Sequence, residues 1–140
     1  MKKIAVVYWS QTGNTEQMAM AVLEGIRSSG ADGTVFTASE FNPDETVNYD
    51  AVAFGCPAMG AEELEDTEFE PMFASCESKL NGKKIALFGS YGWGTGEWMD
   101  IWKDRCIRLG ADIAATLICN YEPDDEILNK CKALGSTLAE

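Results

Sequence analysis

Five apolar stretches of six or seven residues alternate with longer amphipathic stretches along the chain. The first and third stretches lack the regular alternation of apolar and polar residues that marks a strand with one solvated face. They are therefore expected to be strands buried on both faces of a sheet. The second stretch is more polar, as is typical of an edge strand. The predicted strands are residues 3–9, 34–39, 51–56, 84–89 and 113–119.

Four amphipathic stretches, three between these strands and one after the last, predict α-helices. In the first of them apolar side chains recur with a period near 3.6 residues, as at Met18, Val22 and Ile26, so one face of the helix is expected to be buried. The predicted helices are residues 14–29, 67–80, 97–109 and 123–138.

Several residues mark the ends of these elements. Gly30 follows the first helix and predicts a left-handed cap. Residues 42–44 open a short turn or helix. The pattern Thr67-x-x-Glu70 has the form of a capping box, and Pro123 suits the first turn of the last helix.

The alternation of strand and helix predicts the α/β class, as a three-layer doubly wound fold with a five-stranded parallel sheet covered by helices on both faces. A length of 140 residues is that of one domain, residues 1–140. In such folds ligands bind at the carboxyl ends of the strands, where the strand order reverses. The loops after the first, third and fourth strands are therefore the candidate site.

The turn after the first strand is rich in hydroxyl groups. It consists of Ser10, Gln11, Thr12, Gly13, Asn14 and Thr15. The following helix begins with free N–H groups and the positive end of a dipole, which together bind phosphate. No Lys or Arg lies between Ile4 and Ile26, so the turn is not a Walker P-loop. It suits a phosphate monoester that stays bound, although a polar turn in which Ser and Thr only cap the helix is the alternative.

Composition excludes several function classes. The net charge of -12 makes nucleic acid an unsuitable partner, whereas a basic protein surface would suit it. The chain has no His, which excludes Ser-His-Asp and Cys-His catalysis. Its five Cys contain no C-x-x-C, so no metal is predicted and buried thiols in a reducing compartment are expected. No apolar run reaches the roughly 18 residues of a membrane span, and no signal peptide is evident, so a cytoplasmic location is expected.

Two further loops complete the candidate site. In the loop at 90–98, Tyr91 and Trp93 stand among Gly92, Gly94 and Gly96, which lets the backbone approach a flat ligand between aromatic walls. Residues 56–72, after the third strand, contain six acids and no base. These acids are Glu62, Glu63, Glu65, Asp66, Glu68 and Glu70. Most of them are interpreted as a solvated face, and the functional alternative is that they oppose added negative charge on a ligand.

Three segments, 8–15, 55–66 and 87–99, carry a family resemblance in the expected order: YWSQTGNT, GCPAMGAEELED and LFGSYGWGTGEWM. The chain resembles short-chain flavodoxins of the clostridial type over nearly its whole length. The resemblance implies strand order 2-1-3-4-5 and one FMN held without a covalent bond. It further implies a low-potential flavoprotein that carries single electrons, cycling between semiquinone and hydroquinone, and is not an enzyme.

The resemblance also implies roles for particular residues. The turn at 10–15 would hold the phosphate. The ring would lie between Met59 and Trp93, with the backbone near Gly92 facing its pyrimidine edge and the Glu62 carboxylate accepting from N3–H. Ser90, Ala58 and Asn120 are weaker candidates near the ribityl chain and phosphate. The full set of cofactor-binding candidates is Ser10, Gln11, Thr12, Gly13, Asn14, Thr15, Pro57, Ala58, Met59, Gly60, Ala61, Glu62, Ser90, Tyr91, Gly92, Trp93, Gly94 and Asn120.

Three positions depart from the family pattern. Gln11 stands where many relatives have Gly, Pro57 where some have Ser, and Ala61 where Asp, Asn or Ser is common. A further hypothesis is that the Met59–Gly60 peptide turns its carbonyl toward flavin N5, which the conformational freedom of Gly would allow.

Expected partners are redox enzymes with basic docking faces, such as ferredoxin-type reductases and oxidoreductases, and a monomer is expected. The alternatives are a flavodoxin-like FMN enzyme, such as an NAD(P)H:quinone reductase, and a phosphoacceptor receiver domain. The receiver domain would need acids after the first and third strands, where Ser10, Cys56 and Pro57 stand.

Overall fold

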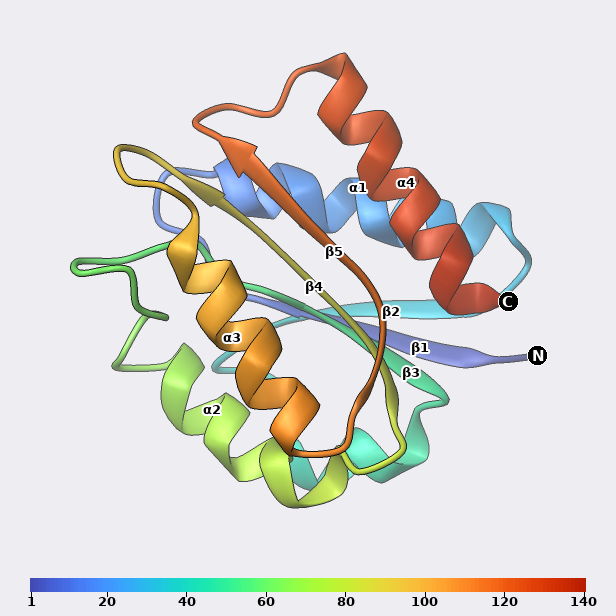
Figure 1. Ribbon diagram of the computed structural model, residues 1–140. Helices are drawn as coiled ribbons and strands as arrows, with labels where there is room; N and C mark the ends of the chain where they lie inside the picture. Colours follow the sequence, from blue (N-terminus) through green and yellow to red (C-terminus); the bar gives the residue numbers. More distant parts are fainter.

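The computed structural model describes all residues, 1–140, as a parallel sheet between two layers of helices (Figure 1). The strands are β1 Lys3–Tyr8, β2 Asp32–Thr37, β3 Ala51–Gly55, β4 Lys84–Tyr91 and β5 Asp112–Asn120. The helices are α1 Asn14–Ser28, α2 Phe69–Cys76, α3 Glu97–Arg108 and α4 Asp125–Ala139, with short 3₁₀ helices η1 Pro43–Asn48 and η2 Glu77–Lys79. The predicted alternation of strands and helices is confirmed.

The strand order is β2-β1-β3-β4-β5, and every neighbouring pair is parallel. The predicted α/β fold and strand order 2-1-3-4-5 are thus confirmed, and β2 is an edge strand as its polar sequence indicated. The order reverses between β1 and β3, so the turns after these strands diverge to opposite sides of the sheet and leave a crevice between them.

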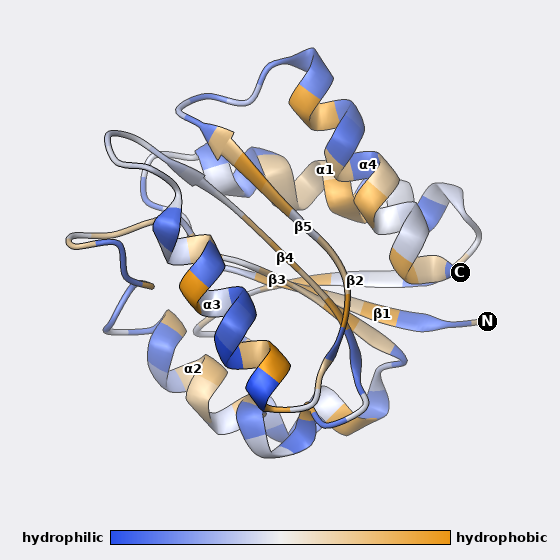
Figure 2. Cartoon of the chain, in the orientation of Figure 1, coloured by the Kyte–Doolittle hydropathy of each residue, from blue (hydrophilic) through white to orange (hydrophobic).

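Two hydrophobic clusters cover the two faces of the sheet. α1 and α4 lie on one face, with Met18, Val22 and Leu134 against the strands, while α2 and α3 cover the other with Phe73 and Trp102. Figure 2 shows the strands as predominantly apolar and the helices as a mixture of apolar and polar stretches, and the buried residues of α1 include Met18, Val22 and Ile26. The period of 3.6 in α1 therefore marked its buried face correctly.

All five cysteines are free and buried, as the sequence indicated. Burial raises the pKa of the Cys106 and Cys131 thiols to about 12. The thiols therefore stay protonated at neutral pH, and protonated thiols are poor nucleophiles.

Two expectations about helix ends are wrong. Thr67 and Glu70 do not form a capping box, because α2 begins at Phe69. The buried Glu65 carboxylate instead accepts hydrogen bonds from the backbone amides of Glu68 and Phe69 at the start of this helix. Pro123 lies before the last helix, which Asp124 caps by accepting from Ile127 N at 2.9 Å. Gly30, at φ 86°, adopts the predicted left-handed conformation after α1.

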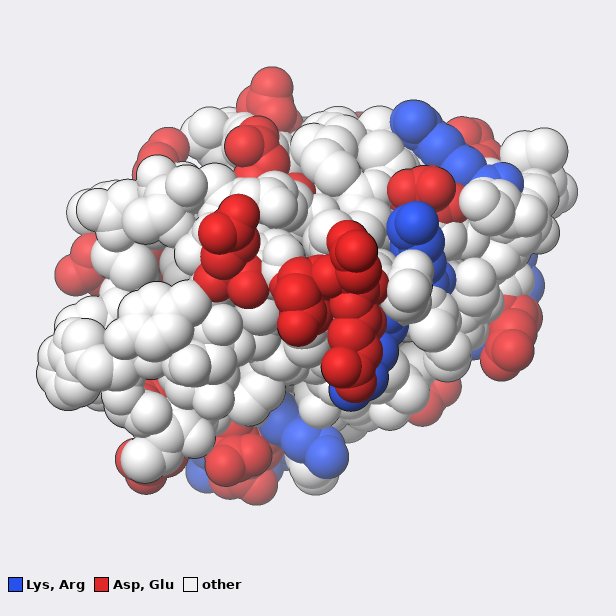
Figure 3. All heavy atoms as spheres, turned by 90° about the horizontal axis from the view of Figure 1, so that it is seen from above, with Lys and Arg blue, Asp and Glu red and all other residues white.

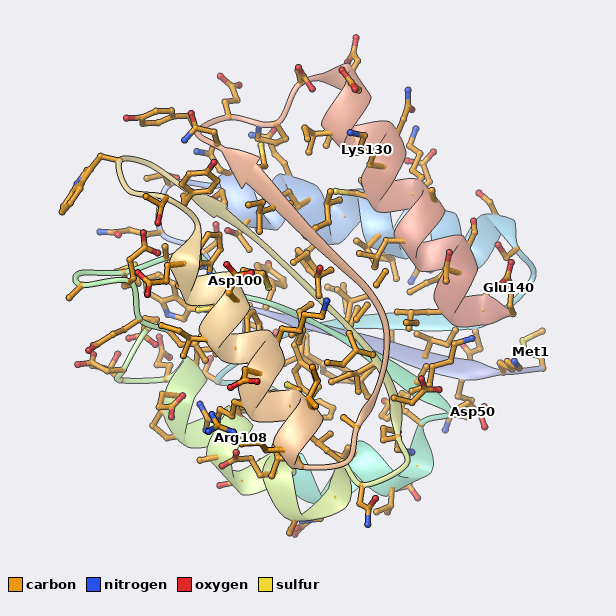
Figure 4. All side chains as sticks on the ribbon, viewed as in Figure 1. Met1, Asp50, Asp100, Arg108, Lys130 and Glu140 are labelled. Atoms are coloured by element: carbon orange, nitrogen blue, oxygen red, sulfur yellow. The ribbon has the colours of Figure 1, made fainter.

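The two ends of the sheet differ in what they carry. Met1, Asp50 and Glu140 lie together at the amino ends of the strands (Figure 4), where Lys3 N donates to Asp50 Oδ2 at 2.8 Å. The loops of the candidate site leave the opposite end. None of the helices combines the length and apolar character needed to cross a bilayer.

Candidate functional site

Three loops meet at the carboxyl ends of β1, β3 and β4. The buried hydroxyls of Thr15 and Ser90 lie 3.1 Å apart and join the start of α1 to β4. Ala58 N donates to Ser90 O at 3.1 Å and brings in the loop after β3. The structure thus brings the predicted segments 10–15, 57–62 and 90–94 together at the carboxyl end of the sheet.

The turn after β1 presents backbone amides. Gly13, at φ 98°, is the N-cap residue of α1 and supplies no side-chain cap. Ser10 Oγ instead accepts from Gly13 N and Glu16 N, each at 3.2 Å. The amides of the two residues between, Asn14 and Thr15, have no acceptor within the protein, since a helix leaves its first N–H groups unpaired.

The side chains of this turn differ in their exposure to solvent. Gln11 and Thr12 are exposed, whereas Thr15 is buried against Ser90. A polar hollow of about 490 Å³ adjoins the turn on the side of β2. On its wall Tyr8 donates to Glu16 at 3.0 Å, and burial together with this carboxylate raises the pKa of Tyr8.

The loop after β3 is a tight hairpin. Met59 and Glu63 exchange two backbone hydrogen bonds, of 2.8 and 2.9 Å, across Gly60, Ala61 and Glu62. Gly60 has φ 50° and open space where a Cβ would lie. One of these bonds runs from Glu63 N to Met59 O, so the hairpin holds the carbonyl that the hypothesis of a turning Met59–Gly60 peptide would need to move. The Gly60 carbonyl accepts no such bond and is the freer of the two.

Glu62 ties this hairpin to the loop after β4. Its carboxylate accepts from Thr95 N at 3.1 Å and from Trp98 N at 2.9 Å, and so caps α3. Gly94 has φ 117°, which L side chains rarely adopt, and a Cβ there would lie 2.5 Å from Glu62 Oε1, so both the backbone conformation and the close approach favour Gly. Both carboxylate oxygens retain lone pairs for a further donor.

The loop after β4 projects an aromatic ring. Trp93 is 84% exposed at its tip, while Tyr91 packs against Trp98 with ring centroids 5.5 Å apart. Asn120 Nδ2 donates to Gly92 O at 2.8 Å and to Tyr91 O at 3.3 Å. Asn120 therefore secures the loop that carries Trp93.

Three of the six acids, Glu63, Asp66 and Glu68, are exposed as a solvated face would be, whereas the other three have specific partners. Glu65 is buried and caps α2, with its hydrogen bonds outweighing burial to lower its pKa. Glu62 caps α3, and Glu70 pairs with Arg105 at 2.9 Å. Glu62 thus joins the hairpin to α3, and Glu70 joins α2 to α3.

Sequence reasoning missed two residues beside the site. Trp9, directly before Ser10, donates from Nε1 to Glu68 at 3.1 Å and lines a hollow of about 340 Å³ together with Met59 and Gly60. Its place at the end of β1 could have indicated this. Tyr121, at φ 60°, lies against Gly92, and no local sequence signal marks a tyrosine for that conformation.

With this geometry established, comparison with known proteins identifies the family. The family described as Flavodoxin matches residues 6–135. The chain belongs to the flavodoxin family. It is 47% identical to the flavodoxin of Megasphaera elsdenii, over 98% of both chains, and 46% identical to that of Clostridium beijerinckii, over 96% of this chain and 97% of that one.

A solved flavodoxin has the same fold. The solution structure of two-electron reduced Megasphaera elsdenii flavodoxin matches with a TM-score of 0.90 at 47% identity, covering 97% of this chain and 98% of that one. Flavodoxins bind FMN and carry electrons to redox partners. The protein is accordingly an FMN-binding electron carrier and not an enzyme, and the quinone reductase alternative is not favoured.

Proposed function

We propose that the crevice between the loops after β1, β3 and β4 holds the FMN, with its phosphate on the turn at 10–15 and its ring between Met59 and Trp93. The bound FMN supplies reversible one-electron chemistry at low potential. The observation that supports this placement is that the turn at 10–15 and the loops after β3 and β4 are in contact at the carboxyl end of the sheet. The turn would hold the phosphate, and the two loops would hold the ring.

The cradle suits the phosphate of FMN. The free amides of Asn14 and Thr15 stand at the positive end of the α1 dipole, which stabilises an anion by about 0.3–1 kcal/mol at an exposed site and by up to about 2 kcal/mol at a partly buried one. Thr12 and Ser10 add hydroxyl groups. Because no cation is present, affinity depends on many hydrogen bonds to a ligand that stays bound.

The ring walls suit a flat heterocycle. A flat ligand would cover the Trp93 residue, which is 84% exposed. Met59 would contact the opposite face of that ligand with a flexible thioether side chain. Glu62 fixes the distance between the two loops and can accept from a ring N–H. The carboxylates nearby disfavour additional negative charge on the ring, by about 0.5 kcal/mol for each charge at 8 Å in water and more where water is excluded.

We infer that the partners present basic docking faces, as ferredoxin-type reductases and oxidoreductases would, because the protein carries a net charge of -12. We further infer a single FMN-binding domain over 1–140, acting as a monomer in the cytoplasm. The family match over 6–135 supports the first of these, and five free thiols suit a reducing compartment.

Flavin titration of the apoprotein tests the proposal. We expect one FMN per chain, with its fluorescence quenched, and weaker binding of riboflavin, which shares the ring but lacks the phosphate. Gln11→Glu adds a negative charge to the cradle and should weaken FMN about tenfold, because a dianion and a charge about 6 Å apart in water repel by about 1.4 kcal/mol. Riboflavin affinity should not change.

Gln17→Glu, at an exposed position on α1 six residues beyond Gln11, is the matched control and should alter FMN affinity less. Failure of the apoprotein to bind either flavin would overturn the proposed function. Equal weakening of FMN and riboflavin by Gln11→Glu would contradict the position of the phosphate.

A further inference from the structure

The end of β5 holds the backbone of the aromatic loop through three hydrogen bonds. Asn120 Nδ2 donates to Gly92 O at 2.8 Å and to Tyr91 O at 3.3 Å. Tyr121 N donates to Tyr91 O at 2.7 Å. Because a carbonyl oxygen only accepts, the Asn120 side chain must present its NH₂ group to this loop.

These bonds fix the direction of two amide groups. A trans peptide is planar, so its C=O and the next N–H point in opposite directions. Holding the carbonyls of Tyr91 and Gly92 toward β5 therefore turns the N–H groups of Gly92 and Trp93 away from β5. Neither N–H has an acceptor within the protein. They are oriented donors available to a ligand.

Tyr121 covers the same loop in a strained conformation. Its φ of 60° is unusual for a large side chain, and Glu62 is the one other non-glycine residue with positive φ. Both residues contact the segment from Gly92 to Trp98: Tyr121 Cε1 lies 3.4 Å from the position of a Cβ on Gly92, and Glu62 caps α3. Strain of this kind persists where surrounding structure imposes it, commonly at ligand sites.

We infer that Asn120 and Tyr121 are positioning residues for the flavin ring. Asn120 orients the Gly92 and Trp93 amides, and the Tyr121 ring shields the Gly92 peptide from water. Neither acts on the phosphate. This inference rests on the proposed function, since it assigns these residues to the ring half of that site.

Comparing FMN with riboflavin separates the ring half from the phosphate half. Asn120→Ala removes two of the three hydrogen bonds, so we expect the Kd of both flavins to rise about tenfold with their ratio unchanged. Asn120→Asp keeps the shape but sets a carboxylate against two carbonyls, so its loss should be larger. The visible circular dichroism of bound flavin should change in both variants. Asn129→Ala, at an exposed position on α4 without a side-chain hydrogen bond, is the matched control.

Tyr121→Asn gives a second, opposite readout. Asn adopts positive φ more readily than Tyr, so the urea midpoint of the apoprotein should rise. Affinity for both flavins should nevertheless fall severalfold, because the cover over the Gly92 peptide is lost. A purely structural role would move stability and affinity in the same direction.

Two results would overturn the inference about Asn120, and a third would overturn the proposed function. Unchanged flavin affinity in the Asn120 variants would overturn the inference. A loss confined to FMN would also overturn it, because Asn120 would then serve the phosphate. If the unaltered protein bound neither flavin, the proposed function itself would fail.

Discussion

Glu65 shows how a single side chain can determine the shape of a loop. It is 5% exposed, and it accepts from Glu68 N and Phe69 N at 2.8 Å each and from Thr67 N at 2.8 Å. Burial alone would raise the pKa of this carboxyl. The hydrogen bonds, that of the Thr67 hydroxyl first among them, hold its pKa below the usual range. The ionised form is therefore part of the native structure.

Glu65→Gln should lower the free energy of unfolding at pH 7 by about 1–3 kcal/mol, because Gln keeps one accepting oxygen and sets an NH₂ donor against the backbone amides that bond to the other. A depressed pKa contributes stability above the unfolded value, about 4.3, and this contribution is lost as pH falls through the folded value. The difference between wild type and variant should therefore shrink below about pH 4. Urea unfolding at several pH values measures it, with Glu63→Gln, an exposed neighbour, as control. A difference that stayed constant into acid would contradict this role.

At this scale the sequence predicted which loops form the site but not what each side chain binds. Residue identity placed Glu62 and Glu65 in an acidic run, where a solvated face was the ordinary interpretation. Their partners, the amides of Trp98 and Phe69, are determined by how α2 and α3 pack. Tyr121 escaped notice for the same reason, because its contact with Gly92 joins loops distant in the chain.

At the scale of elements, hydrophobic patterning predicted most strands to within about two residues. It succeeded because β1 and β3 are buried on both faces and read as continuous apolar runs. It failed at ends determined by tertiary contacts. α2 was predicted to span 67–80 but ends at Cys76 and continues as the 3₁₀ turn η2. Helix ends depend on which acceptors the rest of the fold supplies.

The contact between α1 and α4 requires glycine. A Cβ on Gly135 would lie 2.2 Å from Val22 O, and one on Gly25 would lie 2.0 Å from Lys132 O. Gly135→Ala would gain about 1 kcal/mol in helix propensity but must separate two backbones, and overpacking costs about 1–3 kcal/mol. We expect a net loss of up to about 2 kcal/mol in urea unfolding. Asn129→Ala, exposed on the same helix, should be neutral or stabilising, and a stabilised Gly135→Ala would show that the helices can separate freely.

At the scale of the whole molecule, charge is distributed unevenly between the two ends of the sheet. The loops at 10–15, 57–66 and 90–96 contain no Lys or Arg. In Figure 3, which views the molecule from above, basic side chains lie mostly on the half of the molecule that carries the termini, whereas acidic side chains are spread over both halves. A partner approaching these loops therefore meets acidic side chains and no basic ones.

This distribution predicts how salt affects electron transfer. Opposite charges speed encounter at low ionic strength, and at physiological salt the field is screened within about 8 Å. Electron transfer from the reduced holoprotein to a redox protein with a basic docking face should therefore slow about tenfold or more between low and high salt. Ferricyanide, a small anion, is the matched oxidant and should react faster as salt rises, because repulsion from the acidic protein is screened. Stopped-flow absorbance follows both reactions. If salt slowed the reaction with both oxidants, electrostatic attraction would not explain the result. Screening should affect a basic protein and the ferricyanide anion in opposite directions, so a common slowing would indicate a general effect of salt on the protein.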